Sequence, residues 1–254
     1  MAKPLEGRMA VMTGASGGLG LHFARVLADA GAAVALMARR ADRIEAAAAE
    51  IVAAGGRAAA IELDVADAAA IGPALDQAEV ALGPLSIMVN NAGISGEGLA
   101  LDISADDWDA TFAVNVRGVF LGSREAARRM MANGEAEAGR ARILNIASIG
   151  AHTVLPGLAA YCASKAAVAQ MTRVLAREWA RPGIAVNALC PGYIETDLNS
   201  EWFATEGGQR QFKSWPRRRF MDETDLDAAL LMLAGPAARA ITGSVITLDD
   251  GQTL

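Results

Sequence analysis

Short apolar segments alternate with longer helical patterns along the whole chain, and no other feature constrains its fold as strongly. The segments that predict strands are 8–13, 33–38, 58–62, 86–90, 142–147, 184–189 and 244–248. Several of them are apolar on both faces, as strands buried between two layers of helices are. The helical patterns lie between them at 19–30, 41–54, 67–82, 106–132, 159–181 and 223–234. This alternation predicts an α/β fold with a doubly wound parallel sheet and helices on both of its faces.

Two of the helical patterns begin at a recognisable capping residue. Asp67 precedes an Ala-rich run, and Ser104 precedes acidic residues that would occupy the first turn of a helix. Both side chains can accept a hydrogen bond from a free backbone N–H at a helix start. We therefore expect Asp67 and Ser104 to be N-caps.

The chain has 254 residues, which suits one large domain or two small ones. No shift in composition marks a boundary, so we expect a single domain over 1–254. Residues 193–222, here called the cover segment, hold half of the aromatic side chains: Tyr193, Trp202, Phe203, Phe212, Trp215 and Phe220. The cover segment is predicted to be an insertion that closes over an apolar or ring-bearing substrate. Alternatively, its aromatic side chains only seat it on the core or on another subunit.

Charge and cysteine content exclude several classes of protein. The net charge is −6, whereas phosphate neutralisation by a nucleic-acid binder needs a basic face. Two cysteines, Cys162 and Cys190, make no disulfide framework and suit the cytoplasm. The chain begins without a signal-peptide pattern, and polar residues, Gly and Pro interrupt its longest charge-free stretch, 143–164. We expect no nucleic acid, membrane or metal among its partners.

A glycine-rich turn joins the first predicted strand to the first predicted helix. The turn reads TGASGGLG over residues 13–20, with glycines at 14, 18 and 20. A backbone without Cβ atoms can lie against a pyrophosphate, and the N-terminus of the following helix attracts its charge. The turn therefore predicts a dinucleotide site. The alternative is a loop that needs glycine only for its positive φ angles.

The end of the second predicted strand bears on the choice of cofactor. An NAD site usually carries a carboxylate there, which accepts a hydrogen bond from the ribose 2′-hydroxyl. This chain instead has Ala38, followed by Arg39 and Arg40, whose guanidinium groups could clamp a 2′-phosphate. NADP(H) is therefore favoured and NAD(H) stays possible. Alternatively, Arg40 and Arg43 belong to the solvated start of a helix.

Three residues on two neighbouring segments suggest acid–base chemistry. Tyr161 and Lys165 are four residues apart on a predicted helix and so project from one face. A free tyrosine, with a pKa near ~10, is a poor base at neutral pH. A neighbouring ammonium group would favour the phenolate. Ser148, at the end of the fifth predicted strand, could hold a substrate oxygen near Tyr161. By chance, the same Tyr–Lys spacing occurs on many helices.

Taken in order, these motifs resemble those of the short-chain dehydrogenase/reductase family in its compact form. The resemblance covers nearly the whole chain. It rests on TGASGGLG at 13–20, Asp64-Val65, the NNAG motif at 90–93, Asn115, Ser148, Tyr161 with Lys165, and Pro191-Gly192 with Thr196. It implies a Rossmann-type subunit that transfers a hydride between a nicotinamide and a secondary alcohol or ketone. It also implies a homotetramer or homodimer, with helices 106–132 and 159–181 packing across a two-fold axis.

The resemblance also implies roles for individual residues. Tyr161 would be the general acid/base, Ser148 would polarise the substrate oxygen, Lys165 would lower the pKa of Tyr161, and Asn115 would hold a water in a proton relay. The implied cofactor-binding residues are Gly14, Ser16, Gly18, Leu19, Gly20, Arg39, Asp64, Val65, Asn91, Gly93, Tyr161, Lys165, Pro191, Gly192, Ile194 and Thr196. The predicted substrate-binding residues are Ser148, His152, Tyr193 and Trp202. For His152 the alternative is a loop histidine without a role.

The chain departs from the family pattern in three places. Gly17 stands where many NADP-using members carry a basic residue, so one phosphate contact is missing. Residues 249–252 read Asp-Asp-Gly-Gln where the family often has Asp-Gly-Gly. Glu135 and Glu137 follow the helix on which acyl-carrier-protein reductases display basic residues, which disfavours an acidic carrier protein.

Three alternative functions remain at this stage. The chain could be a non-catalytic dinucleotide-binding or scaffolding protein of the same fold, although Asn115, Ser148, Tyr161 and Lys165 are all present. A sugar-nucleotide epimerase usually has a longer C-terminal region than the one after Pro191. Trans-2-enoyl reductases space their Tyr and Lys further apart than this chain does.

Overall fold

The computed structural model describes residues 3–195 and 200–254, and in these ranges it forms one seven-stranded parallel sheet. The strand order is β3-β2-β1-β4-β5-β6-β7, so the predicted doubly wound Rossmann-type sheet is confirmed. The strands are β1 (Met9–Thr13), β2 (Ala33–Ala38), β3 (Arg57–Glu62), β4 (Leu85–Asn90), β5 (Arg142–Ile146), β6 (Ala185–Pro191) and β7 (Val245–Leu248). β1, β2, β4, β5 and β6 are buried along their whole length, which explains why both of their faces are apolar.

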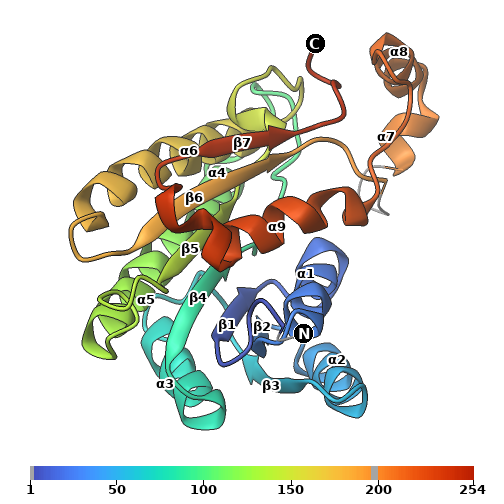
Figure 1. Ribbon diagram of the computed structural model, residues 1–254. Coiled ribbons are helices and arrows are strands. Elements are labelled where there is room, and N and C mark those ends of the chain that lie inside the picture. Colours follow the sequence, from blue (N-terminus) through green and yellow to red (C-terminus); the bar gives the residue numbers. More distant parts are fainter. Residues whose placement is uncertain (1–2, 196–199) are drawn as a thin grey trace.

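Helices cover both faces of the sheet (Figure 1). One face carries α1 (Gly18–Asp29), α2 (Ala41–Ala53) and α9 (Asp227–Ala234), and the other carries α3 (Ile71–Leu82), α5 (Val119–Ala132) and α6 (Ala159–Trp179). Each layer has its own core. Leu27, Leu36 and Leu230 belong to the first core, and Leu75 and Met130 belong to the second.

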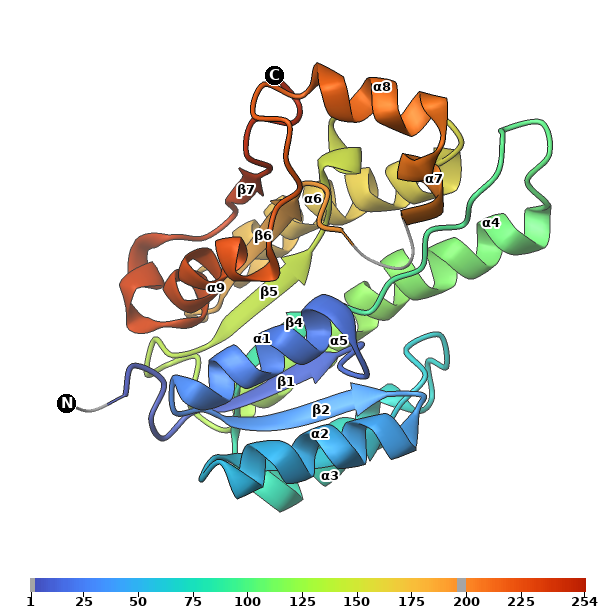
Figure 2. The same cartoon turned by 90° about the vertical axis from the view of Figure 1, so that its right-hand side faces the viewer.

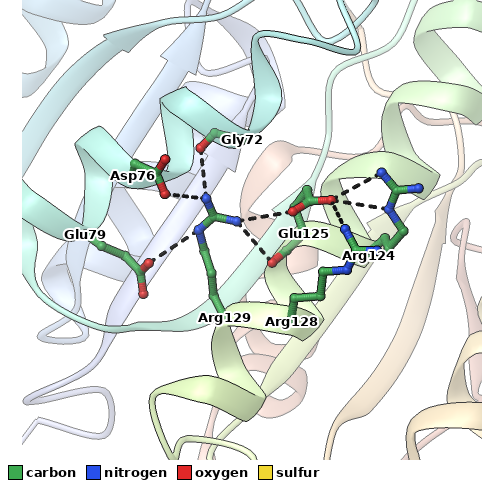
Figure 3. A network of polar contacts seen from close by, with 7 residues as sticks. All are labelled: Gly72, Asp76, Glu79, Arg124, Glu125, Arg128 and Arg129. Carbon is green, nitrogen blue, oxygen red and sulfur yellow. Dashed lines mark hydrogen bonds and ion pairs between the residues drawn. The ribbon is translucent and has the colours of Figure 1, made fainter.

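Arg129 on α5 ties two helices of the second layer together (Figure 3). Its guanidinium group donates to the carbonyl of Gly72 on α3 at 2.9 Å and pairs with Asp76 and Glu79 of the same helix. It also pairs with Glu125, one turn earlier on α5. Only 16% of the Arg129 side chain is exposed, so this network is shielded from solvent more than an ordinary surface pair.

Two predicted helix boundaries differ from the structure. The pattern at 106–132 is a continuous helical unit of three parts: α4 (Ala105–Phe112), a π-helical turn η1 (Ala113–Gly118) and α5. Ser104 caps it as predicted, because its hydroxyl accepts from the N–H of Asp107 at 3.0 Å. The N-cap prediction for Asp67 is wrong. Its carboxylate accepts from the N–H of Ala69 and so closes a separate turn, and α3 begins only at Ile71.

The carboxyl ends of the strands form the edge at which the candidate site lies. Between β1 and β4 the chain order in the sheet reverses, and such a switch point leaves a crevice beyond the strand ends. Figure 2 shows the two helices of the cover segment, α7 (Ser200–Ala204) and α8 (Glu206–Ser214), above this edge. The loop that leads into β1 lies at the opposite end of the molecule.

The described part of the chain contains neither a membrane-spanning helix nor a cluster of metal ligands. No helix in it is long and apolar enough to cross a membrane. It also contains no group of three or more His, Cys, Asp or Glu side chains that could hold a metal ion.

Candidate active site and cofactor cradle

The glycine-rich turn between β1 and α1 needs its glycines for two different reasons. Gly14 and Gly18 have positive φ angles of 69° and 50°, which side chains rarely allow. Gly20 lies directly against the carbonyl oxygen of Gly14 and the side-chain amide of Asn91, where a Cβ atom would not fit. No side chain caps the N-terminus of α1, so its first N–H groups stay free for an anion. These features fit a pyrophosphate.

Thr13 joins the glycine-rich turn to the loop that follows β4. Its hydroxyl accepts from the backbone N–H groups of Asn91 and Ala92 at 3.0 and 3.1 Å. The side-chain amide of Asn91 in turn donates to the carbonyl of Thr13 at 3.0 Å. The predicted ribose contact, Asn91, is therefore fixed beneath the turn at the switch point. Thr13 had not been predicted as a site residue, although it begins the TGASGGLG motif.

The two arginines after β2 differ in their contacts. Arg40 donates from Nε and a terminal nitrogen to the hydroxyl of Ser16, at 3.1 and 2.8 Å. It thus lies over the glycine-rich turn, but it is also exposed at the N-cap of α2 (Ala41–Ala53), so the alternative of a solvated helix start stays open. Arg39 is exposed and has no hydrogen bond or ion pair with any residue that the structure describes.

The other predicted residues on the adenine side lie around the same crevice. Asp64 accepts from the N–H of Ala66 at 2.9 Å and shapes the turn after β3. Val65 packs against Gly118, which has no room for a side chain there. Gly93 lies where a Cβ atom would be 3.4 Å from both Asn115 Oδ1 and Lys165 Nζ. The loop after β4 thus leads from the adenine side toward the proposed reacting centre.

Ser148, Tyr161 and Lys165 converge as the sequence predicts. The Ser148 hydroxyl accepts from the N–H of Gly150 at 3.0 Å, and its own proton is free for the side-chain hydrogen bond that it shares with Tyr161. Lys165 lies 5.5 Å from the centre of the Tyr161 ring. Its Nζ donates to the carbonyl of Ile146 at 2.9 Å, at the end of β5.

Burial disfavours the charged forms of both titratable groups. It raises the pKa of Tyr161 above its ordinary value, and the Ser148 hydrogen bond opposes this rise. Burial likewise lowers the pKa of Lys165 to about 8. Lys165 is not among the groups that shift the pKa of Tyr161 in this structure, and the expectation that it lowers this pKa stays a prediction.

Asn115 is fully buried in the π-helical turn η1 and fastens it to two neighbours. Its Oδ1 accepts from the N–H of Ile94 and its Nδ2 donates to the carbonyl of Ile94, both at 2.9 Å. The same Nδ2 donates to the hydroxyl of Ser164 at 3.0 Å, and that hydroxyl donates to the carbonyl of Tyr161 at 2.7 Å. Ser164, which was not predicted, therefore links Asn115 to the backbone of Tyr161.

The aromatic side chains of the cover segment pack mainly on one another. The Tyr193 ring stacks on Trp215, with centroids 5.4 Å apart, and meets Phe203 edge-on at 5.2 Å. Phe212 and Phe220 complete this cluster. Phe203 and Trp215 are only 6% and 4% exposed. The alternative in which these aromatic side chains seat the segment is therefore the one that the packing supports.

Two predicted substrate-binding residues, Trp202 and His152, are not part of the aromatic cluster. Trp202 is 49% exposed, and its indole nitrogen donates to Oε1 of Gln211 at 2.9 Å. His152 is exposed, and its Nε2 lies 3.4 Å from the hydroxyl of Thr247 on β7. His152 is thus placed at the sheet edge, whereas Tyr193 and Trp202 belong to the cover segment.

The C-terminal turn, residues 249–252, holds both ends of the cover segment. The Gln252 amide accepts from the N–H of Tyr193 at 2.6 Å and donates to the carbonyls of Tyr193 and Arg219. Asp250, whose side chain is 7% exposed, pairs with Arg217 and Arg219. The hydrogen bond from Arg219 holds the pKa of Asp250 below its usual value.

The remaining predicted residues lie at the end of β6. Pro191 is buried at its last position, and Gly192 lies directly against Gln252 and Asp249, where a side chain would not fit. Ile194 is buried and pairs with Met221 in an isolated parallel bridge. Thr196, predicted to meet the nicotinamide carboxamide, lies outside the described residues.

Comparison with known proteins identifies this arrangement. A model of the short chain dehydrogenase family matches residues 8–207. The chain belongs to the short-chain dehydrogenase family. A D-threitol dehydrogenase of Mycolicibacterium smegmatis is 36% identical to it over 98% of this chain and 94% of the relative. A galactitol 2-dehydrogenase of Cereibacter sphaeroides is 41% identical over 98% and 96%.

A solved structure extends the comparison to the fold. A gluconate 5-dehydrogenase from Burkholderia cenocepacia, in complex with NADP and tartrate, superposes with a TM-score of 0.92. It is 35% identical and covers 99% of this chain and 97% of its own. This short-chain dehydrogenase is thus an NAD(P)-dependent enzyme acting on CH–OH groups or the corresponding carbonyls, and the alternative of a non-catalytic protein does not hold.

Proposed function

We propose that this short-chain dehydrogenase interconverts a secondary alcohol and its ketone, with Tyr161 as the general acid/base. One observation carries the proposal. The Ser148 hydroxyl is hydrogen-bonded to Tyr161, and Lys165 lies beside the Tyr161 ring, at the sheet edge next to the glycine-rich turn. A substrate oxygen bound there would meet one hydroxyl that polarises it and one that exchanges its proton.

The proposed roles follow from these contacts. During oxidation Tyr161 would act as the phenolate: its phenol would first give its proton toward solvent, the phenolate oxygen would then take the alcohol proton, and Ser148 would donate a hydrogen bond that holds the substrate oxygen in place. NAD(P), when bound, supplies the hydride acceptor. Because burial keeps the Tyr161 phenol protonated at neutral pH, the same residue is ready to act as the acid in ketone reduction. Lys165 and a water held by Asn115 would pass the proton toward solvent.

For the cofactor we propose NADP(H), with NAD(H) as the alternative. Gly14, Gly18 and Gly20 would line the pyrophosphate, and Asp64, Val65 and Asn91 would line the adenosine half. Arg40 supports the choice of NADP(H), because it already lies over Ser16 of the glycine-rich turn, where its guanidinium could pair with a 2′-phosphate. Arg39 beside it is free to provide a second contact.

We also propose a single domain over 1–254, a location in the cytoplasm, and a homotetramer or homodimer. The two cysteines support the location, since both are free thiols in the structure. The proposed interface uses the helices α4, α5 and α6. Light scattering coupled to size-exclusion chromatography would give the number of subunits directly.

The Tyr161→Phe variant tests the reaction. It removes the hydroxyl and keeps the ring beside Lys165, so we expect turnover to fall below detection while NADPH still binds. A panel of secondary alcohols and ketones is assayed with both cofactors by nicotinamide absorbance, and cofactor binding is measured by fluorescence. Normal turnover in this variant would overturn the assignment of Tyr161.

The panel also tests the reaction class. If the wild-type protein binds the cofactor but reacts with none of the ketones, this result would count against the proposed alcohol–ketone chemistry. The relatives named above suggest that polyols and sugar acids should be included alongside simple alcohols.

A further inference from the structure

Gly150 lies beside both Ser148 and the ring of Tyr161, in the short 3₁₀ turn η2 (Ile149–Ala151) that follows β5. Its backbone N–H donates to Oγ of Ser148 at 3.0 Å. A Cβ atom at this position would lie 3.4 Å from Cε1 of Tyr161. A residue without a side chain is therefore in reach of both members of the proposed reacting pair.

The N–H of Gly150 restricts what the Ser148 hydroxyl can do. A serine hydroxyl has one proton to donate and two lone pairs that accept, and the Gly150 N–H occupies one of these lone pairs. Ser148 is only 7% exposed, so little water competes for its proton. The proton is left for the hydrogen bond with Tyr161, which favours the phenolate form of that residue.

The missing side chain sets how closely the Tyr161 ring can approach this turn. Gly150 does not have a positive φ angle, so its backbone would accept another residue. Space is the obstacle, because the same Cβ atom would also lie 3.3 Å from Sγ of Cys162 and 3.3 Å from Cδ1 of Leu155. In a close-packed site, a methyl group cannot be added without moving at least one of these neighbours. Cys162 and Tyr161 are adjacent on the first turn of α6, so a push on either one displaces both.

We infer that Gly150 is a positioning residue for the reaction: its N–H directs the Ser148 hydroxyl toward Tyr161, and its missing side chain keeps the Tyr161 ring within reach of that hydroxyl. The inference rests on the proposed function. A side chain at this position would weaken the contact between Ser148 and Tyr161 while leaving the glycine-rich turn of the cofactor cradle unchanged.

Gly150→Ala tests this role in catalysis. It keeps the N–H and adds one methyl group beside the Tyr161 ring. We expect kcat for alcohol oxidation to fall about three- to tenfold, the range of one neutral hydrogen bond, and the Kd of NADPH to stay within about twofold. Because the Ser148 hydrogen bond lowers the pKa of Tyr161, weakening it should move the midpoint of the pH profile of kcat upward by about 0.5 to 1 pH unit. A lower kcat with an unchanged midpoint would overturn the inference.

A titration of Tyr161 itself separates this route from simple crowding. The chain has only two tyrosines, Tyr161 and Tyr193, so protein labelled with 3-fluorotyrosine gives two fluorine resonances, and Tyr193→Phe assigns them. In Gly150→Ala and in Ser148→Ala the Tyr161 resonance should titrate at a higher pH than in the parent protein. If Gly150 acts through Ser148, the double variant should titrate no higher than Ser148→Ala alone. Additive shifts would mean that the methyl group only excludes water from Tyr161, and the inference would then be wrong.

Gly56→Ala is the matched control for crowding. Gly56 also lacks a positive φ angle, and a Cβ atom there would lie 2.8 Å from Cγ2 of Ile51 on α2. It precedes β3 and so lies at the amino edge of the sheet, opposite the candidate site. We expect Gly56→Ala to lower the free energy of unfolding and to leave the pH midpoint of kcat unchanged. A midpoint that moves as far as in Gly150→Ala would contradict a specific role of Gly150.

The fluorine titration needs no turnover, so the two proposals can fail separately. Alcohol oxidation by the wild type, together with an unmoved Tyr161 titration in Gly150→Ala, refutes the inference and leaves the proposed function standing. A protein that binds NADPH and turns over no alcohol or ketone of any kind refutes both.

Discussion

Burial disfavours the charged form of Lys165, and this residue therefore lowers the stability of the folded protein. The side chain is 5% exposed, and its pKa is lowered from 10.5 to about 8. Its amino group has one backbone acceptor, the carbonyl of Ile146. A cation kept in such a place stabilises the reaction at the expense of the folded state.

Replacing Lys165 should make the protein more stable. At pH 7 the folded protein holds a proton on Lys165 at a penalty, so Lys165→Met should raise the free energy of unfolding by about 2–3 kcal/mol. Because the folded pKa is depressed, the unfolded chain binds more protons between pH 8 and 10.5, and the stability of the wild type rises over that range. The advantage of the variant should therefore shrink as pH rises. Urea unfolding of both proteins at pH 7, 8.5 and 10 measures the difference in their unfolding free energies. A difference that does not change with pH would contradict the lowered pKa of Lys165.

The two arginines after β2 make a second prediction at the scale of single residues. Arg40→Ala should lower kcat/KM for NADPH about 10- to 100-fold, as expected for loss of a charged hydrogen bond to phosphate. The value for NADH should change little. Arg39→Ala is the matched control. A larger fall in kcat/KM for NADPH in this variant than in Arg40→Ala would assign the phosphate contact to Arg39. A wild-type preference for NADH would overturn the choice of NADP(H).

Single residues also show where sequence reasoning stops. Ser148, Tyr161 and Lys165 could be predicted to meet because two of them share a helix face and the third ends a strand. Ser164 lies inside the same motif, yet its bond to Asn115 joins two helices that are far apart in the sequence and so leaves no sequence signal. Gln211 and Gln252 carry no sequence signal, because their partners come from distant parts of the chain.

At the scale of elements, the strands were predictable and the cover segment was not. Each strand begins and ends within two residues of its predicted range, because a short apolar run between two helical patterns strongly indicates a buried strand. The π-helical turn was missed because residues 113–118 continue the surrounding helical pattern. Helices α7 and α8 were missed because they are short and polar, and their position depends on the aromatic cluster and the C-terminal turn.

The C-terminal turn should protect the cover segment from proteolysis. Asp250 holds Arg217 and Arg219, which are both trypsin sites. Asp250→Asn removes the charge, so we expect faster tryptic cleavage after these arginines and a higher KM for the alcohol substrate. Glu206→Gln is the control, because Glu206 is 95% exposed and its pair with Arg210 contributes little. Equal cleavage rates in both variants would show that the turn does not restrain the segment.

For the whole molecule, the layer formed by α3, α5 and α6 depends on Arg129 as well as on its apolar core. Arg129 bridges α5 to α3 through the Gly72 carbonyl and the carboxylates of Asp76 and Glu79, and it also pairs with Glu125 of its own helix. This bridge lies on helices beside the proposed subunit interface, so it also stiffens the surface that a second copy would meet.

Removing the bridge should cost more than removing a surface charge. Arg129→Met leaves Asp76, Glu79 and Glu125 without their shared partner, and we expect a loss of about 1–2 kcal/mol in unfolding free energy. Arg128 pairs with the same Glu125 but is 62% exposed, so Arg128→Met should change stability by less than about 0.5 kcal/mol. Chemical denaturation of both variants makes the comparison. Equal losses would mean that Arg129 does not link the helices.

The aromatic cluster gives the enzyme an optical signal of its own. Of its four tryptophans, Trp202 and Trp215 lie in the cover segment, and Trp108 and Trp179 lie on helices α4 and α6. Trp215 is buried among other rings, whereas Trp202 is half exposed. Movement of the cover segment would change the surroundings of Trp202 and Trp215. Trp108 and Trp179 would stay unchanged and serve as an internal reference. Stopped-flow emission from the unlabelled protein can therefore follow this segment during a catalytic cycle, and replacing Trp108 and Trp179 by Phe would isolate the signal.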